Sequence, residues 1–197
     1  LSDFAHELSS AGLNRITVSL DSLNHDTFSE INDTNIFLTE VLEGIKEAEK
    51  HNLSPLKINS VIKKGVNDGE IISMAKYFQG TRIELRFIEY MDVGNSNEWR
   101  LDDVVTAKEI LETLSQEFEL EKIIPTNKSD VAKRWKIVGT EDTIGIISSI
   151  SMPFCGDCSR VRISADGKLF TCLFSNTGFN LKNMLRNGST DLEIKNK

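Results

Sequence analysis

The first part of the chain alternates between helical periodicity and short apolar runs. Apolar positions recur at the spacing of one helix face in three segments, and three other segments are apolar or alternating runs of strand length. The expected helices are Ser2–Ser10, Ile36–His51 and Asp68–Phe78, and the expected strands are Arg15–Leu20, Leu56–Ile62 and Arg82–Ile88. Strands that alternate with helices in this way are typical of βα units, so the pattern predicts a parallel sheet.

The pattern changes after about residue 95. A further helix is expected over Thr106–Phe118, with Thr106 as its N-cap, and a final helix over Leu181–Arg186. The short strands expected between these helices are Leu120–Ile124, Lys133–Val138 and Thr143–Ser151, and a hairpin follows them. We therefore expect an α/β protein with a βα domain over residues 1–95 and a mostly β region over residues 96–197.

Several strands of the expected parallel sheet carry polar residues where apolar ones are usual. Lys57 and Asn59 share one face of their strand, Glu84 and Arg86 share one face of theirs, and Ser19 lies near the end of the first strand. A βα barrel places its ligand site at the carboxyl ends of its strands, so these residues indicate a binding site. The alternative is that the strands lie at a sheet edge, or that the lysine stem is buried while its head reaches water.

The composition fits a globular protein and restricts its partners. Hydrophobic residues make up 39% of the chain and charged residues 27%, and the formal net charge is −7 with a pI near 5.1. This acidic balance argues against general nucleic-acid binding but is compatible with a local basic pocket. No apolar run reaches the length of a membrane span and no signal-peptide pattern is present, so we expect a cytoplasmic protein with reduced thiols.

The cysteines of the chain are Cys155, Cys158 and Cys172, and they gather in one stretch. Three thiols cannot all pair as disulfides, and the Cys-x2-Cys spacing lets two thiolates hold one metal centre. A third thiolate leaves the centre one protein ligand short, and the neighbouring Arg160 and Arg162 indicate that a small anionic molecule binds there. The alternatives are buried thiols, or a structural zinc site whose fourth ligand is not evident because the histidines lie far upstream.

The residues around the cysteines predict a hairpin. Arg160–Ser164 alternates, Lys168–Phe174 is mostly apolar, and Ala165-Asp166-Gly167 between them fits a three-residue loop with Gly167 in the left-handed conformation. In that register Arg162 pairs with Phe170 and Arg160 pairs with Cys172, which places both arginines and Cys172 on one face. A two-residue loop would instead turn Cys172 to the other face, so we expect the three-residue loop.

These segments occur together in one known family. The matching segments are Val18–Leu23, Leu56–Asn59, Leu85–Gly94 and Phe154–Arg162, followed by Asp166-Gly167 and Cys172–Phe174. In this order and spacing they resemble the GTP 3′,8-cyclases of molybdenum-cofactor biosynthesis, which are radical S-adenosylmethionine enzymes. The resemblance runs from Leu1 to about Asn187, and the cysteine–arginine block is its most specific part.

The resemblance implies a fold and a cofactor. The fold would be an incomplete, TIM-like βα barrel followed by a C-terminal region that carries a second [4Fe-4S] cluster. Cys155, Cys158 and Cys172 would hold this cluster, and its fourth iron would be free to bind the guanine of GTP. A first [4Fe-4S] cluster, bound elsewhere in such enzymes, cleaves S-adenosylmethionine to a 5′-deoxyadenosyl radical.

The resemblance also implies ligand-binding residues and a reaction. The residues are, for GTP, Lys57, Arg160 and Arg162 and, for S-adenosylmethionine, Ser19, Arg86 and the backbone of Met91. Guanidinium groups suit phosphate oxygens and lysine acts as a point charge, which agrees with these roles. The radical would abstract a ribose hydrogen from GTP, and the sugar carbon would attack C8 to give (8S)-3′,8-cyclo-7,8-dihydroguanosine 5′-triphosphate.

The chain departs from the family outside these segments. This sequence contains no Cys-x3-Cys-x2-Cys motif for the first cluster, no glycine-rich S-adenosylmethionine loop and no Gly-Gly tail. We therefore expect a fragment of a longer protein that cannot cyclise GTP alone. The alternative function is a zinc or iron–sulfur module that binds a nucleotide without catalysis. The resemblance further implies a homodimer and a product that passes to cyclic pyranopterin monophosphate synthase.

Overall fold

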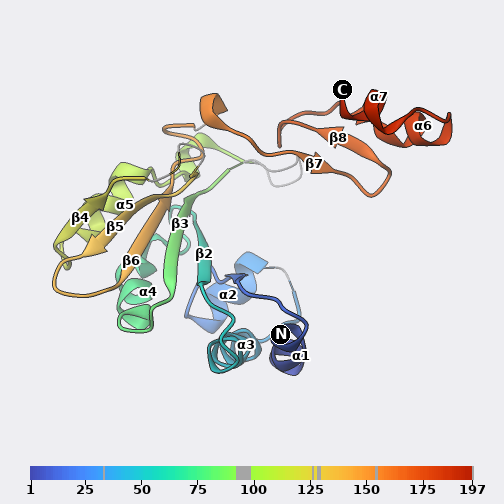
Figure 1. The fold of residues 1–197 in the computed structure, drawn as a ribbon. Coiled ribbons are helices and arrows are strands. Elements are labelled where there is room, and N and C mark those ends of the chain that lie inside the picture. Colours follow the sequence, from blue (N-terminus) through green and yellow to red (C-terminus); the bar gives the residue numbers. More distant parts are fainter. Residues whose placement is uncertain (33, 92–98, 126, 128–129, 154, 197) are drawn as a thin grey trace. The chain divides into compact units, whose positions relative to one another are not determined.

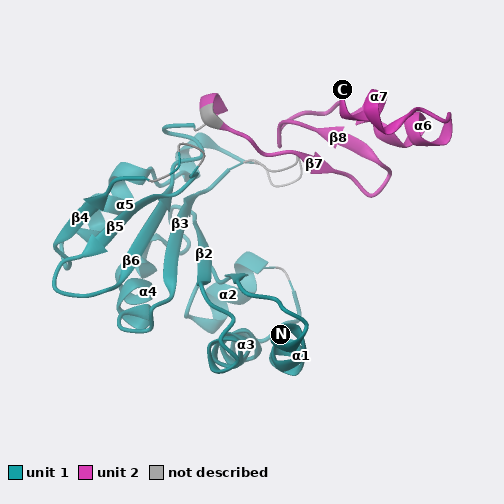
Figure 2. Ribbon diagram, in the orientation of Figure 1, with its two compact units in different colours: residues 1–91, 99–154 teal, residues 92–98, 155–197 magenta. Residues whose placement is uncertain are grey.

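The structure is a computed structural model that describes residues 1–32, 34–91, 99–125, 127, 130–153 and 155–196 (Figure 1). Two compact units are present (Figure 2): unit 1 comprises residues 1–91 and 99–154, and unit 2 is described over residues 155–196. The domain boundary expected at residue 95 lies outside the described residues. The strands between residues 120 and 147 belong to unit 1, where they extend the sheet of the βα units.

Unit 1 contains most of the regular structure. Its elements in chain order are η1 (Ser2–Phe4), α1 (Ala5–Ser10), β1 (Ile16–Ser19), α2 (His25–Asn32), α3 (Leu38–Lys50), β2 (Leu56–Ile62), η2 (Asp68–Glu70), α4 (Ile71–Phe78), β3 (Glu84–Glu89), η3 (Leu101–Asp103), α5 (Ala107–Leu114), β4 (Leu120–Ile123), β5 (Lys133–Ile137) and β6 (Thr143–Ile147), where η marks a short 3-10 turn. Every helix and strand expected from the sequence in this part is present, and α2 was not expected. None of the described helices is long and apolar enough to cross a membrane.

The strands of unit 1 form one six-stranded sheet in the order β1-β2-β3-β6-β5-β4. β1, β2, β3 and β6 are parallel neighbours, whereas β5 and β4 continue the sheet antiparallel to β6. The expected α/β fold class with a mostly parallel sheet is therefore confirmed. The short strands expected after residue 96 are an extension of this sheet and do not form a sheet of their own.

One face of the sheet packs against the helices and forms the core. Ile58 of β2 and Phe87 of β3 are fully buried, and they join a single apolar cluster with Ile45 of α3, Met74 of α4 and Ile110 of α5. Each of these side chains stabilises the fold by about 1.5–3 kcal/mol through burial. The core fixes which strand residues point inward, and so leaves the alternate residues on the opposite face.

The start of α5 shows how the sequence sets a helix boundary. The hydroxyl of Thr106 accepts a hydrogen bond from the amide of Glu109 at 3.2 Å, and the Glu109 carboxylate accepts one from the amide of Thr106 at 2.8 Å. This reciprocal arrangement is a capping box, and it confirms Thr106 as the N-cap.

Unit 2 is small and contains a three-stranded antiparallel sheet in the order β7-β8-β9. Its elements are η4 (Cys155–Asp157), β7 (Arg162–Ile163), β8 (Lys168–Phe170), β9 (Phe179–Asn180), α6 (Leu181–Arg186) and α7 (Asp191–Lys195). The expected hairpin and the final helix, now α6, are confirmed, and β9 and α7 were not expected.

The hairpin has the expected register but is shorter than expected. Arg162 pairs with Phe170, the Ser164 amide donates to the Lys168 carbonyl at 2.9 Å, and Gly167 has φ = +81°, so the three-residue loop is confirmed. The ladder ends at Arg162 and Phe170. The predicted pairing of Arg160 with Cys172 is therefore wrong, because the chain leaves the strand after Phe170 and turns at Cys172.

Candidate functional site

The face of the sheet opposite the helices is lined by polar side chains. Strand pairing sets Ser19 of β1, Asn59 of β2, Arg86 of β3, Gly145 of β6 and Arg134 of β5 in one row across the sheet. Lys57 and Glu84 form the next row. We call the six polar residues of the two rows the polar face: Ser19, Lys57, Asn59, Glu84, Arg86 and Arg134. The predicted sharing of faces by Lys57 with Asn59 and by Glu84 with Arg86 is confirmed.

Arg86 is held in place by a short ion pair. Its Nε lies 2.6 Å from Oε1 of Glu84, and the two side chains are only 18% and 16% exposed. Gly145 makes room for this pair, because a Cβ at that position would lie 2.9 Å from Cγ of Arg86. A shielded, fixed guanidinium of this kind is suited to orienting a ligand in addition to neutralising it.

Lys57 and Asn59, by contrast, carry polar atoms for which the described part of the chain supplies no partner. Within the described part of the chain Lys57 forms no ion pair, and Oδ1 of Asn59 is buried without a hydrogen bond. Burial lowers the pKa of the Lys57 ammonium, the charge of Arg86 lowers it further, and Glu84 partly opposes this. Buried polar groups are normally satisfied, so an unpaired lysine beside an unsatisfied amide indicates a ligand site.

The end of β1 is tied to β2 by a buried polar network. Asp21 is 9% exposed, and its carboxylate accepts a hydrogen bond from the Val61 amide at 2.7 Å. The side-chain amide of Asn67 donates to the carbonyls of Asp21 and Val61 at 2.7 and 2.8 Å. Burial raises the pKa of the Asp21 carboxyl above its ordinary value, and the hydrogen bond from Val61 partly opposes this.

Replacing Asp21 with asparagine is expected to raise the melting temperature at pH 7 by a few degrees, since the amide oxygen can still accept from Val61. The folded pKa of Asp21 lies above its unfolded value, so the wild-type protein loses stability as pH rises from about 4 through the folded pKa. The gain from Asp21→Asn should therefore grow over that interval and stay level above it. Urea unfolding at a series of pH values measures this, and a difference that does not vary with pH would contradict it.

The cysteines of unit 2 are free and exposed. Cys155 and Cys158 lie on one turn, in which the Cys158 amide donates to the Cys155 carbonyl at 3.4 Å, and Cys172 follows β8. Three free thiols are a donor set that iron–sulfur clusters use, so their chemistry fits. Their arrangement does not complete the site, since no three His, Cys, Asp or Glu side chains among the described residues converge as metal ligands.

Arg160 interacts directly with one of these thiols. Its Nε donates to Sγ of Cys158 at 3.4 Å. The pKa of the Cys158 thiol is lowered, first by a hydrogen bond from the Arg160 backbone, then by the Arg160 side chain. Arg160 thus favours the thiolate form of Cys158, which is the form that binds metals.

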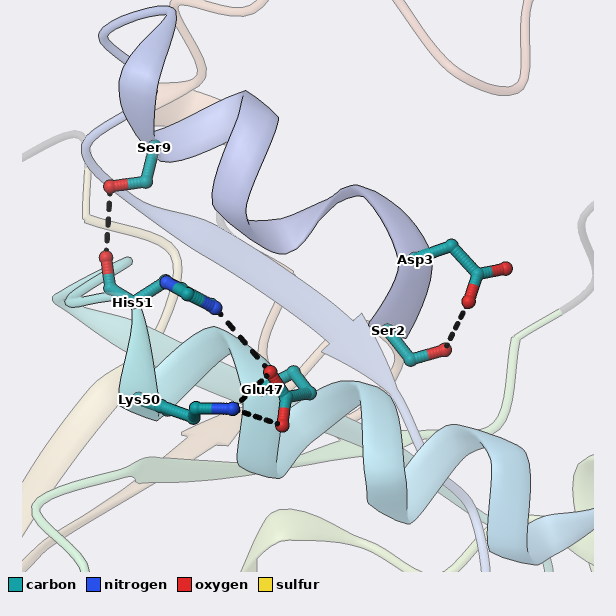
Figure 3. A network of polar contacts seen from close by, with 6 residues as sticks. All are labelled: Ser2, Asp3, Ser9, Glu47, Lys50 and His51. Carbon is teal, nitrogen blue, oxygen red and sulfur yellow. Dashed lines mark hydrogen bonds and ion pairs between the residues drawn. The ribbon is translucent and has the colours of Figure 1, made fainter.

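A third polar cluster lies between α1 and α3, away from the polar face (Figure 3). Ser9 donates to the His51 carbonyl at 2.9 Å, and Glu47 pairs with Lys50 at 3.0 Å and with His51 at 3.4 Å. The hydrogen bond from Lys50 lowers the pKa of Glu47. These contacts join the end of α3 to α1, and we assign them a structural role.

Sequence reasoning missed two features of the polar face. Arg134 joins it, and Gly145 makes room within it, only through the pairing of β5 with β6 and of β6 with β3. The one signal in the sequence was a glycine inside an apolar run, which marks a close approach of another group. The remaining predicted site residues lie as follows: Met91 is half-buried just after β3, Arg162 opens β7, and Arg160 precedes it.

The fold and sites define a class of protein: an α/β protein with a polar sheet face, joined to a segment that carries three free thiols. The chain belongs to the Molybdenum Cofactor Synthesis C family, which matches residues 83–197. Residues 2–78 also match the Radical SAM superfamily. The boundary between these matches falls between α4 and β3, so the parallel sheet contains strands from both.

Relatives in other organisms match almost the whole chain. A GTP 3′,8-cyclase of Acidothermus cellulolyticus is 44% identical over 98% of this chain and 54% of its own length. GTP 3′,8-cyclases of Staphylococcus epidermidis and Staphylococcus aureus are 45% and 44% identical over 94% and 99% of this chain, and 54% and 57% of their own lengths. The chain thus spans about half the length of the curated relatives that it matches.

A solved structure, a radical SAM methyltransferase from Sphaerobacter thermophilus, is 16% identical with a TM-score of 0.49. The match covers 74% of this chain and 38% of the methyltransferase chain.

Proposed function

We propose that this chain is part of a GTP 3′,8-cyclase, an enzyme of molybdenum-cofactor biosynthesis. The observation that carries the proposal is the identity of 44% over 98% of the chain to proteins of that name. The polar face of unit 1 and the thiol segment of unit 2 support it, because they hold the residue types that a nucleoside triphosphate and an iron–sulfur cluster require.

The proposed roles follow from the chemistry of each side chain. Cys155, Cys158 and Cys172 would hold a [4Fe-4S] cluster, which supplies an iron atom that can accept a ligand atom of the substrate. Arg160 and Arg162 would bind the phosphates of GTP through charge-assisted hydrogen bonds. Arg160 would thereby serve two functions, since it also stabilises the thiolate of Cys158.

The polar face would hold the remaining ligand groups. Lys57 would bind GTP as a point charge, which agrees with the absence of an ion pair to any described residue. Ser19 and the Met91 backbone would contact S-adenosylmethionine, and Arg86 would do so in the orientation that Glu84 imposes. With both ligands fixed by shielded groups, the protein would contribute mainly orientation and the exclusion of water.

Metal content and its response to nucleotide test this proposal. Anaerobic reconstitution of the chain is expected to give about four iron and four sulfide per chain. Electron paramagnetic resonance should then change when GTP is added, since the substrate would approach the cluster. One zinc without sulfide, and no response to GTP, would instead support a structural metal module without catalysis.

A further inference from the structure

Glu89 at the end of β3 is a fully buried carboxylate to which the proposed reaction assigns no role. It has 0% exposure, and its oxygens accept hydrogen bonds from two separate parts of the chain. Oε1 accepts from the amide of Ala107 at 2.6 Å and from the hydroxyl of Ser151. Oε2 accepts from the amides of Ile150 and Ser151, both at 2.7 Å.

The partners of Glu89 are neutral, so the carboxylate does not serve as half of an ion pair. No described cation lies within ion-pair distance of it, and its countercharge comes from the amide dipoles at the start of α5. Burying a carboxylate is expensive unless its oxygens are well satisfied, and apolar residues would hold the core at lower cost. Four hydrogen bonds to two segments therefore indicate a geometric role.

The position of Glu89 suggests what this geometry controls. Met91, the residue proposed to contact S-adenosylmethionine, follows Glu89 closely after β3, and Ser151 lies shortly before Cys155 in the chain. The exit of β3 is held further by Trp99, whose indole N–H donates to the Tyr90 carbonyl at 3.1 Å. The Glu89 carboxylate thus holds together two segments of unit 1: the end of β3 and the turn that follows β6.

We infer that Glu89 is a positioning residue that holds the end of β3 against the turn at Ile150 and Ser151. The end of β3 leads to Met91, and the turn leads to the cysteines. The inference rests on the proposed function. Glu89 touches no proposed ligand and would act through the backbone segments that it holds. Without it, the end of β3 and the turn at Ile150 and Ser151, both in unit 1, would move independently of each other.

The test compares Glu89→Gln with a matched control in the full-length protein. The amide keeps the size of the side chain but places an N–H2 group against backbone donors, so bonds to Ile150 and Ser151 are lost. The control is Asp142→Asn, because Asp142 is also a buried carboxylate that accepts a backbone amide, from Gly80 at 2.9 Å, next to the opposite end of the sheet. Hydrogen exchange, iron content and the paramagnetic response to GTP are measured for both.

We expect amide exchange at Ile150 and Ser151 to accelerate about tenfold or more in Glu89→Gln, the loss equivalent to one strong hydrogen bond. Iron content should be near normal, while the response to GTP weakens and kcat falls more than KM rises. Asp142→Asn, whose amide oxygen can still accept from Gly80, should produce none of these changes. If Glu89→Gln fails to fold, Ser151→Ala, which removes only the hydroxyl contact, should give the same pattern more mildly.

The outcomes separate this inference from the proposed function. A wild-type protein with no iron–sulfur signal would overturn the proposed function and the inference with it. A normal wild-type signal that Glu89→Gln, or Ser151→Ala in its place, leaves unchanged would overturn the inference alone. Equal effects of Glu89→Gln and Asp142→Asn on the GTP response would mean that Glu89 contributes only stability.

Discussion

Replacing Cys172 with alanine in the full-length protein is expected to abolish the conversion of GTP while leaving the fold intact. Cys172 is exposed, so its removal creates no cavity in either unit. It is also one of three thiolates proposed to hold the substrate-binding cluster, and the loss of one should release that cluster. Iron content should fall by about four per chain relative to the wild-type protein.

The neighbouring substitution Thr171→Ala is the matched control, because Thr171 is also exposed and carries no thiol. It should leave iron content and product formation unchanged. Cleavage of S-adenosylmethionine should continue in Cys172→Ala without product, since the proposed first cluster would be held by other residues. Full product formation by this variant would show that Cys172 is not a ligand.

The fold was predictable from the sequence wherever local pattern and burial agree. β2 was predicted to the residue, since Leu56–Ile62 alternates buried and half-buried side chains along its whole length. α2 was missed because Phe28 is its single fully buried side chain, which leaves little periodicity to detect. Its signal was Asn24, whose side chain accepts from the amides of Asp26 and Thr27.

α7 was missed although the sequence carried a clear signal for it. Thr190 and Glu193 have the spacing of a capping box, and in the structure Thr190 accepts from the Glu193 amide at 3.3 Å while the Glu193 carboxylate accepts from the amide of Thr190. Thr106 was recognised as an N-cap because a longer apolar stripe follows it. A short helix therefore has to be predicted from its capping residues alone, because it is too short to show apolar periodicity.

The candidate sites were predictable only where residues lie close in sequence. Lys57 and Asn59 were assigned to one face because strand period is local, whereas the contribution of Arg134 depends on which strands pair. Glu89 could not have been assigned from the sequence, since its donors come from residues far along the chain. The predicted pairing of Arg160 with Cys172 failed for a related reason: strand length depends on where the chain turns, and the turn at Cys172 carries no glycine or proline.

Replacing Lys57 with methionine is expected to weaken GTP binding by about 10- to 100-fold, the loss of a charge-assisted contact to phosphate. Methionine keeps the length of the side chain, so packing on the polar face should be preserved. The charge itself is unfavourable in the unliganded protein, because burial and Arg86 both lower the pKa of Lys57. The variant should therefore melt at a temperature equal to or above that of the wild-type protein.

The matched control is Lys136→Met, since Lys136 lies on β5 with its ammonium paired to Glu141 at 3.0 Å. This substitution should leave GTP affinity unchanged. Comparing GTP with guanosine by calorimetry sharpens the test, because a phosphate contact predicts that Lys57→Met loses affinity for GTP and not for guanosine. Equal losses for both would place Lys57 at the base or ribose. A lysine that lowers stability when unliganded and adds affinity only for the triphosphate is best explained by binding.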